Sequence, residues 1–299
     1  MTVVAKIGGA RAVDPACALA DVASLVADGE DVVVVHGGST AVDDTLEALG
    51  EEPEYVETPS GVVGRFTDER TIEVFEMVLP GRLNTDLVAG LQAEGVNAVG
   101  LSGVDGALLT GPRKSAVRVL EDGKKKVRRG DFSGTIETVN ADLLSTLLDG
   151  GYVPVVTVPM LADGRTPVNA DADRAAAAVA GALGARLVSL TDVPGVLRDP
   201  DDETTLIERV ATETELADLE AAATGFMTRK VMAAIEALDG GAREVIVADA
   251  NVETPITAAL DGGGTHVLPG AVGRDDGDDS NATGNENEDV GKDEEAIES

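Results

Sequence analysis

The sequence predicts an α/β protein built around a doubly wound, mainly parallel sheet. Short valine-rich runs alternate with longer amphipathic segments along residues 1–270, and strands separated by helices of about 10–15 residues pair in parallel. The 299 residues are 43% hydrophobic, which is enough for one large core or two modest ones. Glycine-rich turns follow several of the runs, as they do where a parallel strand leads into a helix.

The elements are expected in the order in which the apolar periodicity changes along the chain. Apolar runs bounded by turn residues predict buried strands, and apolar positions three and four residues apart predict helices. Asp122-Gly123 predicts a hairpin turn between residues 116–120 and 124–128. Strands are expected over residues 2–7, 31–35, 96–101, 153–158, 166–168, 186–190 and 244–247. Helices are expected over residues 14–28, 39–49, 67–78, 81–94, 138–149, 171–183, 226–238 and 253–260.

Composition restricts the class of protein. Acidic residues outnumber basic ones by 55 to 23, for a formal net charge of −32, so we expect no nucleic-acid partner, because the phosphate backbone would repel the chain. No apolar run approaches the ~18 residues of a membrane span, and no signal peptide is expected before Val3. The single Cys17 excludes an internal disulfide and is expected to be a small core residue. We therefore expect a cytoplasmic globular protein.

The surface and the C-terminal end are expected to be unusually acidic. The chain holds 7 Lys against 16 Arg and 55 acids. Such a surface suits a cytoplasm of molar salt, where screening removes self-repulsion; an acidic protein of an ordinary cytoplasm is the alternative. Residues 271–299 hold 11 acids and 2 bases and are expected to form a disordered acidic tail.

Three glycine-rich turns point to an anionic ligand. They follow predicted strands at Gly8-Gly9, Gly37-Gly38 and residues 100–103. Backbone N–H groups at such turns can approach an anion closely, and the next helix adds its positive end, although tight turns also use glycine for geometry alone. Neither a P-loop nor a G-x-G-x-x-G turn after the first strand is present. With only His36 and His266 and one cysteine, we expect no resident metal site.

Two lysines lie where a ligand is expected. Lys6 ends the first strand, and Lys230 lies near the start of a predicted helix. Ammonium groups at these positions could hold the oxygens of a transferring phosphoryl group, although ordinary surface lysines would give the same pattern. Asp171, at the start of the alanine-rich helix, could orient both lysines or be only its N-cap.

Five motifs are spaced along the chain: Lys6-Ile7-Gly8-Gly9, His36-Gly37-Gly38, Arg65, Asn169-Ala170-Asp171 and Phe226-Met227-Thr228-Arg229-Lys230. Taken as a set, they resemble the amino acid kinase family, and within it the N-acetylglutamate kinase group. The resemblance implies a three-layer α/β/α sandwich around a mainly parallel sheet. It also implies transfer of the γ-phosphoryl group of ATP, with Mg²⁺, to a carboxylate, giving an acyl phosphate.

The resemblance also implies a role for individual residues. Lys6 and Lys230 would neutralise charge on the transferring group, and Asp171 would hold both lysines in place. Where family members commonly have an Asn two residues before the Asn-x-Asp triplet, this chain has Pro167. Residues 1–175 would bind the acceptor, residues 176–270 would bind ATP, and a homodimer is expected. The residues implied in acceptor binding are Gly37, Gly38, Arg65 and Asn169.

Three further stretches are similar to [LysW]-aminoadipate and [LysW]-glutamate kinases. They are residues 59–68, 81–84 and 128–134, with Gly64 as a departure, because this subgroup usually has a larger residue there. Those enzymes phosphorylate an amino acid tethered to LysW, a small acidic carrier protein. The resemblance therefore implies an acidic carrier as partner and a place in arginine or lysine biosynthesis, with glutamate and 2-aminoadipate both open as the tethered acceptor.

A basic segment supports the carrier independently of the resemblance. Residues 111–130 hold eight bases and two acids, a local charge of +6 in an acidic chain. A basic hairpin beside the acceptor site would attract an acidic carrier, although a solvated hairpin face or a nucleic-acid contact would have the same composition. The eight bases are Arg113, Lys114, Arg118, Lys124, Lys125, Lys126, Arg128 and Arg129.

Two rival functions stay open on the sequence. An N-acetylglutamate kinase that acts on the free acid would share the lysines and ignore the basic hairpin. A non-catalytic nucleotide-binding module would share the fold, and the presence of Lys6, Asp171 and Lys230 argues against it.

Overall fold

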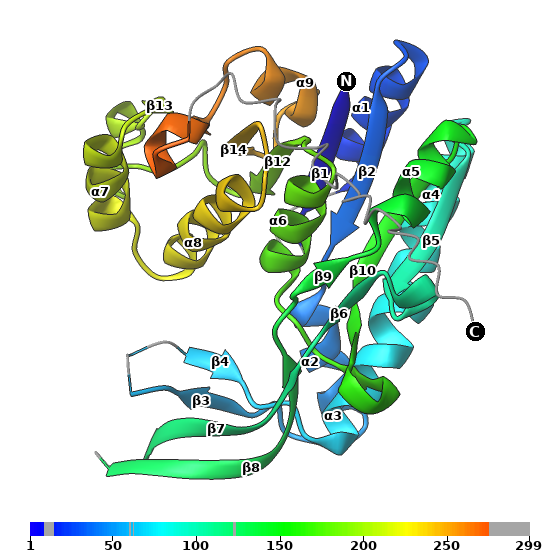
Figure 1. The fold of residues 1–299 in the computed structure, drawn as a ribbon, viewed down its shortest axis with the longest axis vertical. Helices are drawn as coiled ribbons and strands as arrows, with labels where there is room; N and C mark the ends of the chain where they lie inside the picture. The colour runs from blue at the N-terminus through cyan, green and yellow to red at the C-terminus, as the bar shows by residue number, and fades with distance from the viewer. Residues whose placement is uncertain (9–14, 60, 62, 122–123, 275–299) are drawn as a thin grey trace, which may run out of the picture.

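A central sheet organises the chain in the computed structural model, which describes residues 1–8, 15–59, 61, 63–121 and 124–274 (Figure 1). The strand order is β13-β15-β14-β12-β1-β2-β10-β6-β9, and β5 and β11 also pair with β10. Neighbours from β14 through β12, β1 and β2 to β10 run in parallel. The strands of this sheet are β1 (Thr2–Ile7), β2 (Asp31–His36), β5 (Ala98–Gly103), β6 (Leu109–Gly111), β9 (Thr138–Val139), β10 (Val153–Ala162), β11 (Thr166–Val168), β12 (Arg186–Thr191), β13 (Arg209–Val210), β14 (Glu244–Asp249) and β15 (Thr265–Val267).

Helices cover both faces of the sheet, so the three-layer α/β/α architecture is confirmed. Alternate residues of a strand point to opposite faces, and β2 therefore contributes Val33 and Val35 to one apolar core and Val32 and Val34 to the other. The first core packs against α2, α3, α5, α6 and α8, and the second against α1, α4 and α9. The helices are α1 (Pro15–Ala27), α2 (Ser39–Ala48), α3 (Glu69–Glu76), α4 (Asn84–Ala93), α5 (Ala141–Asp149), α6 (Ala172–Ala182), α7 (Glu213–Ala222), α8 (Phe226–Asp239) and α9 (Pro255–Leu260).

Several boundaries differ from the sequence-based expectation. The two helices expected over 67–78 and 81–94 are one continuous run, in which a π-helical segment, Met77–Leu83, contains Pro80 and joins α3 to α4. Proline has no N–H to donate, and the wider π turn accommodates it without ending the helix. Cys17 lies exposed on α1 rather than in the core.

Two antiparallel hairpins extend away from the sheet at the same end of the molecule (Figure 1). The first, β3 (Tyr55–Glu57) with β4 (Val63–Arg65), was not expected from the sequence. The second, β7 (Arg113–Glu121) with β8 (Lys124–Gly134), is the expected basic hairpin and is longer than predicted. Its predicted turn at Asp122-Gly123 lies outside the described residues.

The packed body continues past the expected boundary at residue 270. Ala271 is fully buried, and the Arg274 guanidinium donates to the carbonyls of Leu238 and Ala242. Residues 275–299, which make up most of the predicted acidic tail, lie outside the described part of the chain. Among the described residues, no helix combines the length and the apolar composition that crossing a membrane requires.

Candidate active site

Lys6, Asp173 and Lys230 meet at the carboxyl ends of the parallel strands. Lys6 is the next-to-last residue of β1, Asp173 lies in the first turn of α6, and Lys230 lies in the second turn of α8. The Asp173 Oδ1 atom is 2.6 Å from Lys6 Nζ and 3.3 Å from Lys230 Nζ. Lys230 Nζ also lies 3.5 Å from the hydroxyl of Ser189, which pairs with Lys6 across β1 and β12. Three separate elements therefore bring two ammonium groups to one carboxylate.

The charges of this cluster control its protonation. Burial would raise the pKa of Asp173, but the neighbouring Lys6 and Lys230 charges outweigh burial and hold that pKa at about 2. Burial and the positive charge of Lys6 lower the pKa of Lys230, and Asp173 opposes that shift. At neutral pH the cluster thus holds two cations and one anion, beside the positive N-terminal end of α6. The surplus positive charge favours a further negative charge nearby.

Asp171 does not lie between the lysines, which corrects the role that the family resemblance implied for it. Its Oδ1 atom accepts hydrogen bonds from the backbone N–H groups of Asp173, at 2.9 Å, and Arg174, at 3.2 Å. Asp171 is therefore the N-cap of α6, the alternative that its position in the sequence had left open. The carboxylate that bridges the lysines belongs to Asp173, two residues further along.

The glycine turn after β2 faces the same end of the sheet. His36 Nδ1 is 2.9 Å from the Gly37 carbonyl, and its Nε2 is 3.1 Å from the Asn84 amide nitrogen. Burial lowers the pKa of His36 to about 4, so the ring is neutral at pH 7, donates from Nδ1 and accepts at Nε2. Because the C=O and N–H of one peptide unit point in opposite directions, this bond aims the Gly38 N–H away from His36.

Close packing requires glycine at this turn. A Cβ atom on Gly38 would lie 2.3 Å from Leu83 Cδ1 and 2.7 Å from Leu79 Cδ2, and one on Gly37 would lie 3.1 Å from the Ala172 Cβ atom. The closeness of Gly37 to Ala172 also places the turn against the start of α6, next to Asp173. The Gly37-Gly38 turn and the lysine cluster therefore lie next to each other.

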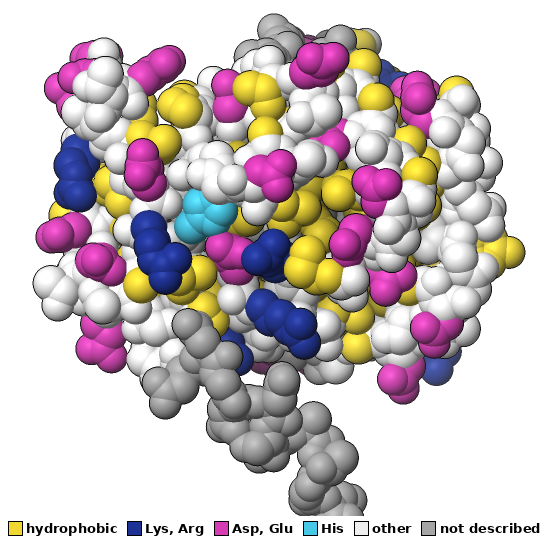
Figure 2. Space-filling model, turned by 90° about the horizontal axis from the view of Figure 1, so that it is seen from above, with side chains coloured by type: hydrophobic (Ala, Val, Ile, Leu, Met, Phe, Trp, Pro, Cys, Tyr) yellow, Lys and Arg dark blue, Asp and Glu magenta, His cyan; other side chains and the backbone are white. Residues whose placement is uncertain are grey.

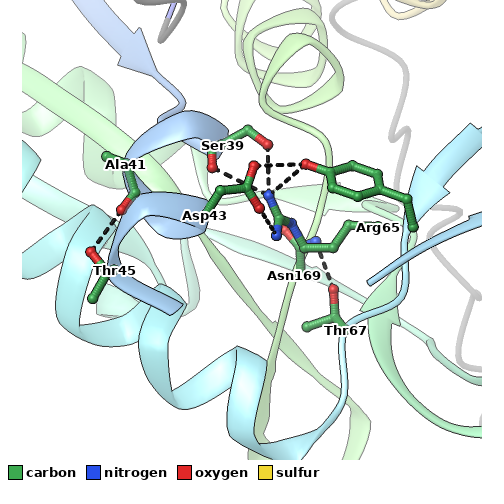
Figure 3. A network of polar contacts seen from close by, with 8 residues as sticks. Ser39, Ala41, Asp43, Thr45, Arg65, Thr67 and Asn169 are labelled. Carbon is green, nitrogen blue, oxygen red and sulfur yellow. Dashed lines mark hydrogen bonds and ion pairs between the residues drawn. The ribbon is translucent and has the colours of Figure 1, made fainter. Parts of the chain in front are cut away.

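Arg65 lies in a network of polar contacts between β4 and α2 (Figure 3). Its Nη1 atom is 2.5 Å from Asp43 Oδ1, and its Nη2 donates to Ser39 Oγ at 2.9 Å and to the Tyr55 hydroxyl at 2.8 Å. The guanidinium also stacks on the rings of Tyr55 and Phe75. Arg65 is thus held rigidly, with its charge balanced by Asp43.

Asn169 connects the acceptor region to the base of the basic hairpin. Its side-chain amide donates to Thr67 Oγ1 at 3.1 Å (Figure 3), and its backbone N–H donates to the carbonyl of Phe132 at 2.7 Å. The Phe132 N–H in turn donates to the carbonyl of Thr67. The hairpin therefore starts beside the residues that the sequence assigned to the acceptor.

The bases of the predicted carrier-docking hairpin form two groups. Some stack on a ring or pair with a carboxylate, and the side chains of the others do neither. Arg113 stacks on Phe132, and Arg128 stacks on Phe66 and forms an ion pair with Glu54. Lys126 pairs with Glu121 at 2.7 Å. The bases whose side chains form no hydrogen bond or ion pair with another described residue are Lys114, Arg118, Lys124, Lys125 and Arg129.

Comparison of the sequence with known proteins shows which family the chain belongs to. The sequence model of the amino acid kinase family matches residues 1–249. The chain belongs to the amino acid kinase family. The [LysW]-aminoadipate kinase of Thermus thermophilus is 47% identical over 268 residues, which cover 89% of this chain and 99% of that protein. An acetylglutamate kinase of Methanopyrus kandleri is 46% identical over 241 residues, which cover 80% of this chain and 91% of that protein.

Solved structures agree with the fold of an amino acid kinase. The carbamate kinase of Giardia superposes with a TM-score of 0.62 at 18% identity, over 89% of this chain and 98% of that one. At this identity the likeness shows the fold alone. In the described part of the chain, no group of three or more His, Cys, Asp or Glu side chains could hold a metal ion.

Three residues of the site were missed by sequence reasoning. Asp173 had a signal, because it repeats the spacing of Asn169 and Asp171. Asp43 and Tyr55 had none, since their role follows from the folding of the β3–β4 hairpin onto α2.

Proposed function

We propose that this chain is a cytoplasmic, ATP-dependent kinase of arginine or lysine biosynthesis. It phosphorylates the side-chain carboxylate of glutamate or 2-aminoadipate tethered to an acidic carrier of the LysW type. The observation that carries the kinase reaction is the Lys6–Asp173–Lys230 cluster at the carboxyl ends of β1 and β12. The identity with [LysW]-aminoadipate kinases supports the choice of acceptor.

The proposed reaction is an in-line displacement at the γ-phosphorus. The acceptor carboxylate is already ionised at neutral pH, so no general base is needed. Its oxygen forms the new P–O bond while the bond to the bridging oxygen of ADP breaks. Lys6 and Lys230 neutralise the negative charge that spreads over the phosphoryl oxygens, and the Gly38 N–H donates to the same region.

The other proposed contacts follow from the same arrangement. Mg²⁺ enters as the complex of the ATP substrate, with phosphate oxygens and water as ligands. Arg65 pairs with an acceptor carboxylate through the N–H groups that Asp43, Ser39 and Tyr55 leave free, and Asn169 holds the acceptor from the other side. The division at about residue 175 into an acceptor half and an ATP half, and the homodimer, remain part of this proposal.

Acyl-phosphate formation tests the proposal directly. The enzyme is given MgATP with N-acetylglutamate, carrier-linked glutamate or carrier-linked 2-aminoadipate, and the product is trapped as a hydroxamate. We expect turnover with a carrier-linked acceptor, and a loss of at least ~100-fold in Lys6→Ala, the scale of one oxyanion contact. ATP binding without transfer to any acceptor would instead support a non-catalytic module.

The second candidate function is that of an N-acetylglutamate kinase acting on the free acid. The 46% identity with an archaeal acetylglutamate kinase favours it specifically. Turnover with N-acetylglutamate at a rate equal to that of the carrier-linked acids would decide for this candidate. It would leave the lysine cluster as the site of transfer and remove the carrier from the proposal.

A further inference from the structure

One face of the β7–β8 hairpin is a bare basic surface. Residues directly opposite each other in an antiparallel pair point to the same side. The register Ala116 with Arg129, Arg118 with Val127 and Leu120 with Lys125 therefore defines one face, which we call the outward face. The side chains of its three bases form no hydrogen bond or ion pair with another described residue, and Val127 on the same face is 64% exposed.

The opposite face of the hairpin is occupied by the protein itself. Arg128 pairs with Glu54 and lies over Phe66, Val119 is buried, and Lys126 pairs with Glu121. The hairpin thus balances its inner charges and leaves three outer cations next to each other without an acid. In a chain of net charge −32, the three cations of this face attract any flexible acidic segment that can reach it.

The chain carries an acidic segment that is long enough to reach this face. Residues 275–299 contain 11 acids and one lysine, for a net charge of −10. The segment starts at Arg274, which the carbonyls of Leu238 and Ala242 hold to the body. Its 25 residues span up to about 85 Å when extended, while a body of this size has a radius of gyration of about 18 Å. Any part of the surface is within its reach.

We propose that the acidic segment 275–299 binds the outward face of the β7–β8 hairpin and competes there with the acidic carrier. Tethering raises the local concentration of the segment to the millimolar range, so even a weak contact would be populated. The contact itself stands independently of the function proposed above, whereas its effect on catalysis rests on that function.

Binding of the segment in trans tests the contact without any carrier. A fluorescein-labelled peptide of residues 275–299 is titrated with the chain ending at Arg274, which keeps every described helix and strand, and anisotropy is measured. We expect saturable binding that weakens at least tenfold in R118E/R129E. The matched control is R198E/R243E, which makes the same change of charge at two exposed arginines outside the hairpin. Equal weakening in both variants, or no binding, would overturn the proposal.

Kinetics test the competition. In the full chain, all acids of 275–299 are replaced by Asn or Gln, which keeps the length. If the segment leaves the outward face free for a tenth to a third of the time, KM for the carrier-linked acceptor falls about threefold to tenfold, with kcat unchanged. The same replacement is expected to do nothing in the R118E/R129E background. An unchanged KM in the otherwise native chain would show that the segment does not compete with the carrier.

The two proposals fail in different ways. If carrier-linked acids are not substrates, peptide binding still decides the contact. If the peptide does not bind, turnover of the carrier-linked acids is unaffected by that result.

Discussion

Asp173 holds two ammonium groups that would otherwise repel each other. We predict that Asp173→Asn lowers kcat by at least about tenfold and moves the alkaline limb of the pH–rate profile to lower pH. The reason is that the Asp173 charge raises the pKa of Lys230, while burial and Lys6 lower it; without the carboxylate, Lys230 loses its proton sooner. The measurement is kcat as a function of pH under saturating MgATP and acceptor.

Asp171→Asn is the matched control for that experiment. Asparagine is as good an N-cap as aspartate, and the Asp171 carboxylate contacts backbone N–H groups of α6 rather than either lysine. The alkaline limb is expected to stay where it is in this variant. A shift as large as that of Asp173→Asn would return the bridging role to Asp171.

The register of this motif explains why sequence reasoning chose the wrong aspartate. When the triplet is taken as residues 169–171, the asparagine that the family carries two residues earlier is replaced by Pro167. When it is taken two residues later, as residues 171–173, the residue two before it is Asn169, as in the family, and the departure moves to Asp171, where the triplet has an asparagine. The choice between Asp171 and Asp173 depends on which side chain turns toward Lys6. Asp171 caps α6, so the side chain that reaches Lys6 is that of Asp173.

His36 makes stability depend on pH. Its pKa is lowered from 6.5 to about 4 by burial, so below pH 6.5 the unfolded chain binds a proton that the folded chain does not. We predict that this group contributes a loss of about 3 kcal/mol in the free energy of unfolding as pH falls from 6.5 to 4, and nothing further below that. Urea unfolding of the native chain and of His36→Gln across this range measures it. Parallel pH curves for the two proteins would contradict the prediction.

At the scale of elements, the turn between β2 and α2 is the tightest part of the site. We predict that Gly38→Ala destabilises the fold by about 1–3 kcal/mol, the cost of overpacking, and lowers kcat, because the new Cβ would push against Leu79 and Leu83. Gly64→Ala, with no atom within 4 Å of the added Cβ, is the control. Thermal unfolding and kcat of both variants are compared, and similar values for the two would show that the turn can relax.

The β7–β8 hairpin is predicted to affect binding of the carrier and not the transfer of the phosphoryl group. Reversing the charges of Arg118 and Arg129 is expected to raise KM for the carrier-linked acceptor at least tenfold with kcat nearly unchanged, because rim charges act on encounter and docking. The R198E/R243E variant controls for net charge. A drop in kcat at unchanged KM would place these bases in catalysis instead.

Elements whose signal is local could be predicted from the sequence, and those that depend on tertiary contacts could not. The valine-rich strands β1 and β2 were found because they are buried on both faces and carry continuous apolar runs. The three-residue strands β3 and β4 have no such run, and Arg65 of β4 joins them to α2 through its contact with Asp43. The passage through Pro80 was missed for a related reason, since a π-helical turn has no signature in local composition.

At the scale of the whole molecule, the acidic charge appears on the surface with basic side chains interspersed (Figure 2). The family and the three-layer fold were predictable, because they rest on motifs and periodicity spread over the whole body, and both are confirmed. The net charge of −32 opposes the compact state through self-repulsion. The local positive charge of the basic hairpin acts differently, because it attracts an acidic partner and favours docking. Salt weakens both.

A titration with salt is therefore expected to stabilise the fold and to weaken docking of the carrier. Between about 0.1 M and about 1 M KCl the Debye length falls from ~10 Å to ~3 Å, so the melting temperature is expected to rise as self-repulsion is screened. Over the same range, KM for a carrier-linked acceptor is expected to rise, because the docking attraction is screened as well. Both effects should level off above about 1 M, where only paired contacts still interact.

A melting temperature that rises steadily to about 3 M without an early phase would assign the stabilisation to exclusion of salt from the surface rather than to charge. A KM that does not respond to salt would show that the carrier docks through apolar contacts such as Val127, and not through the bases around it.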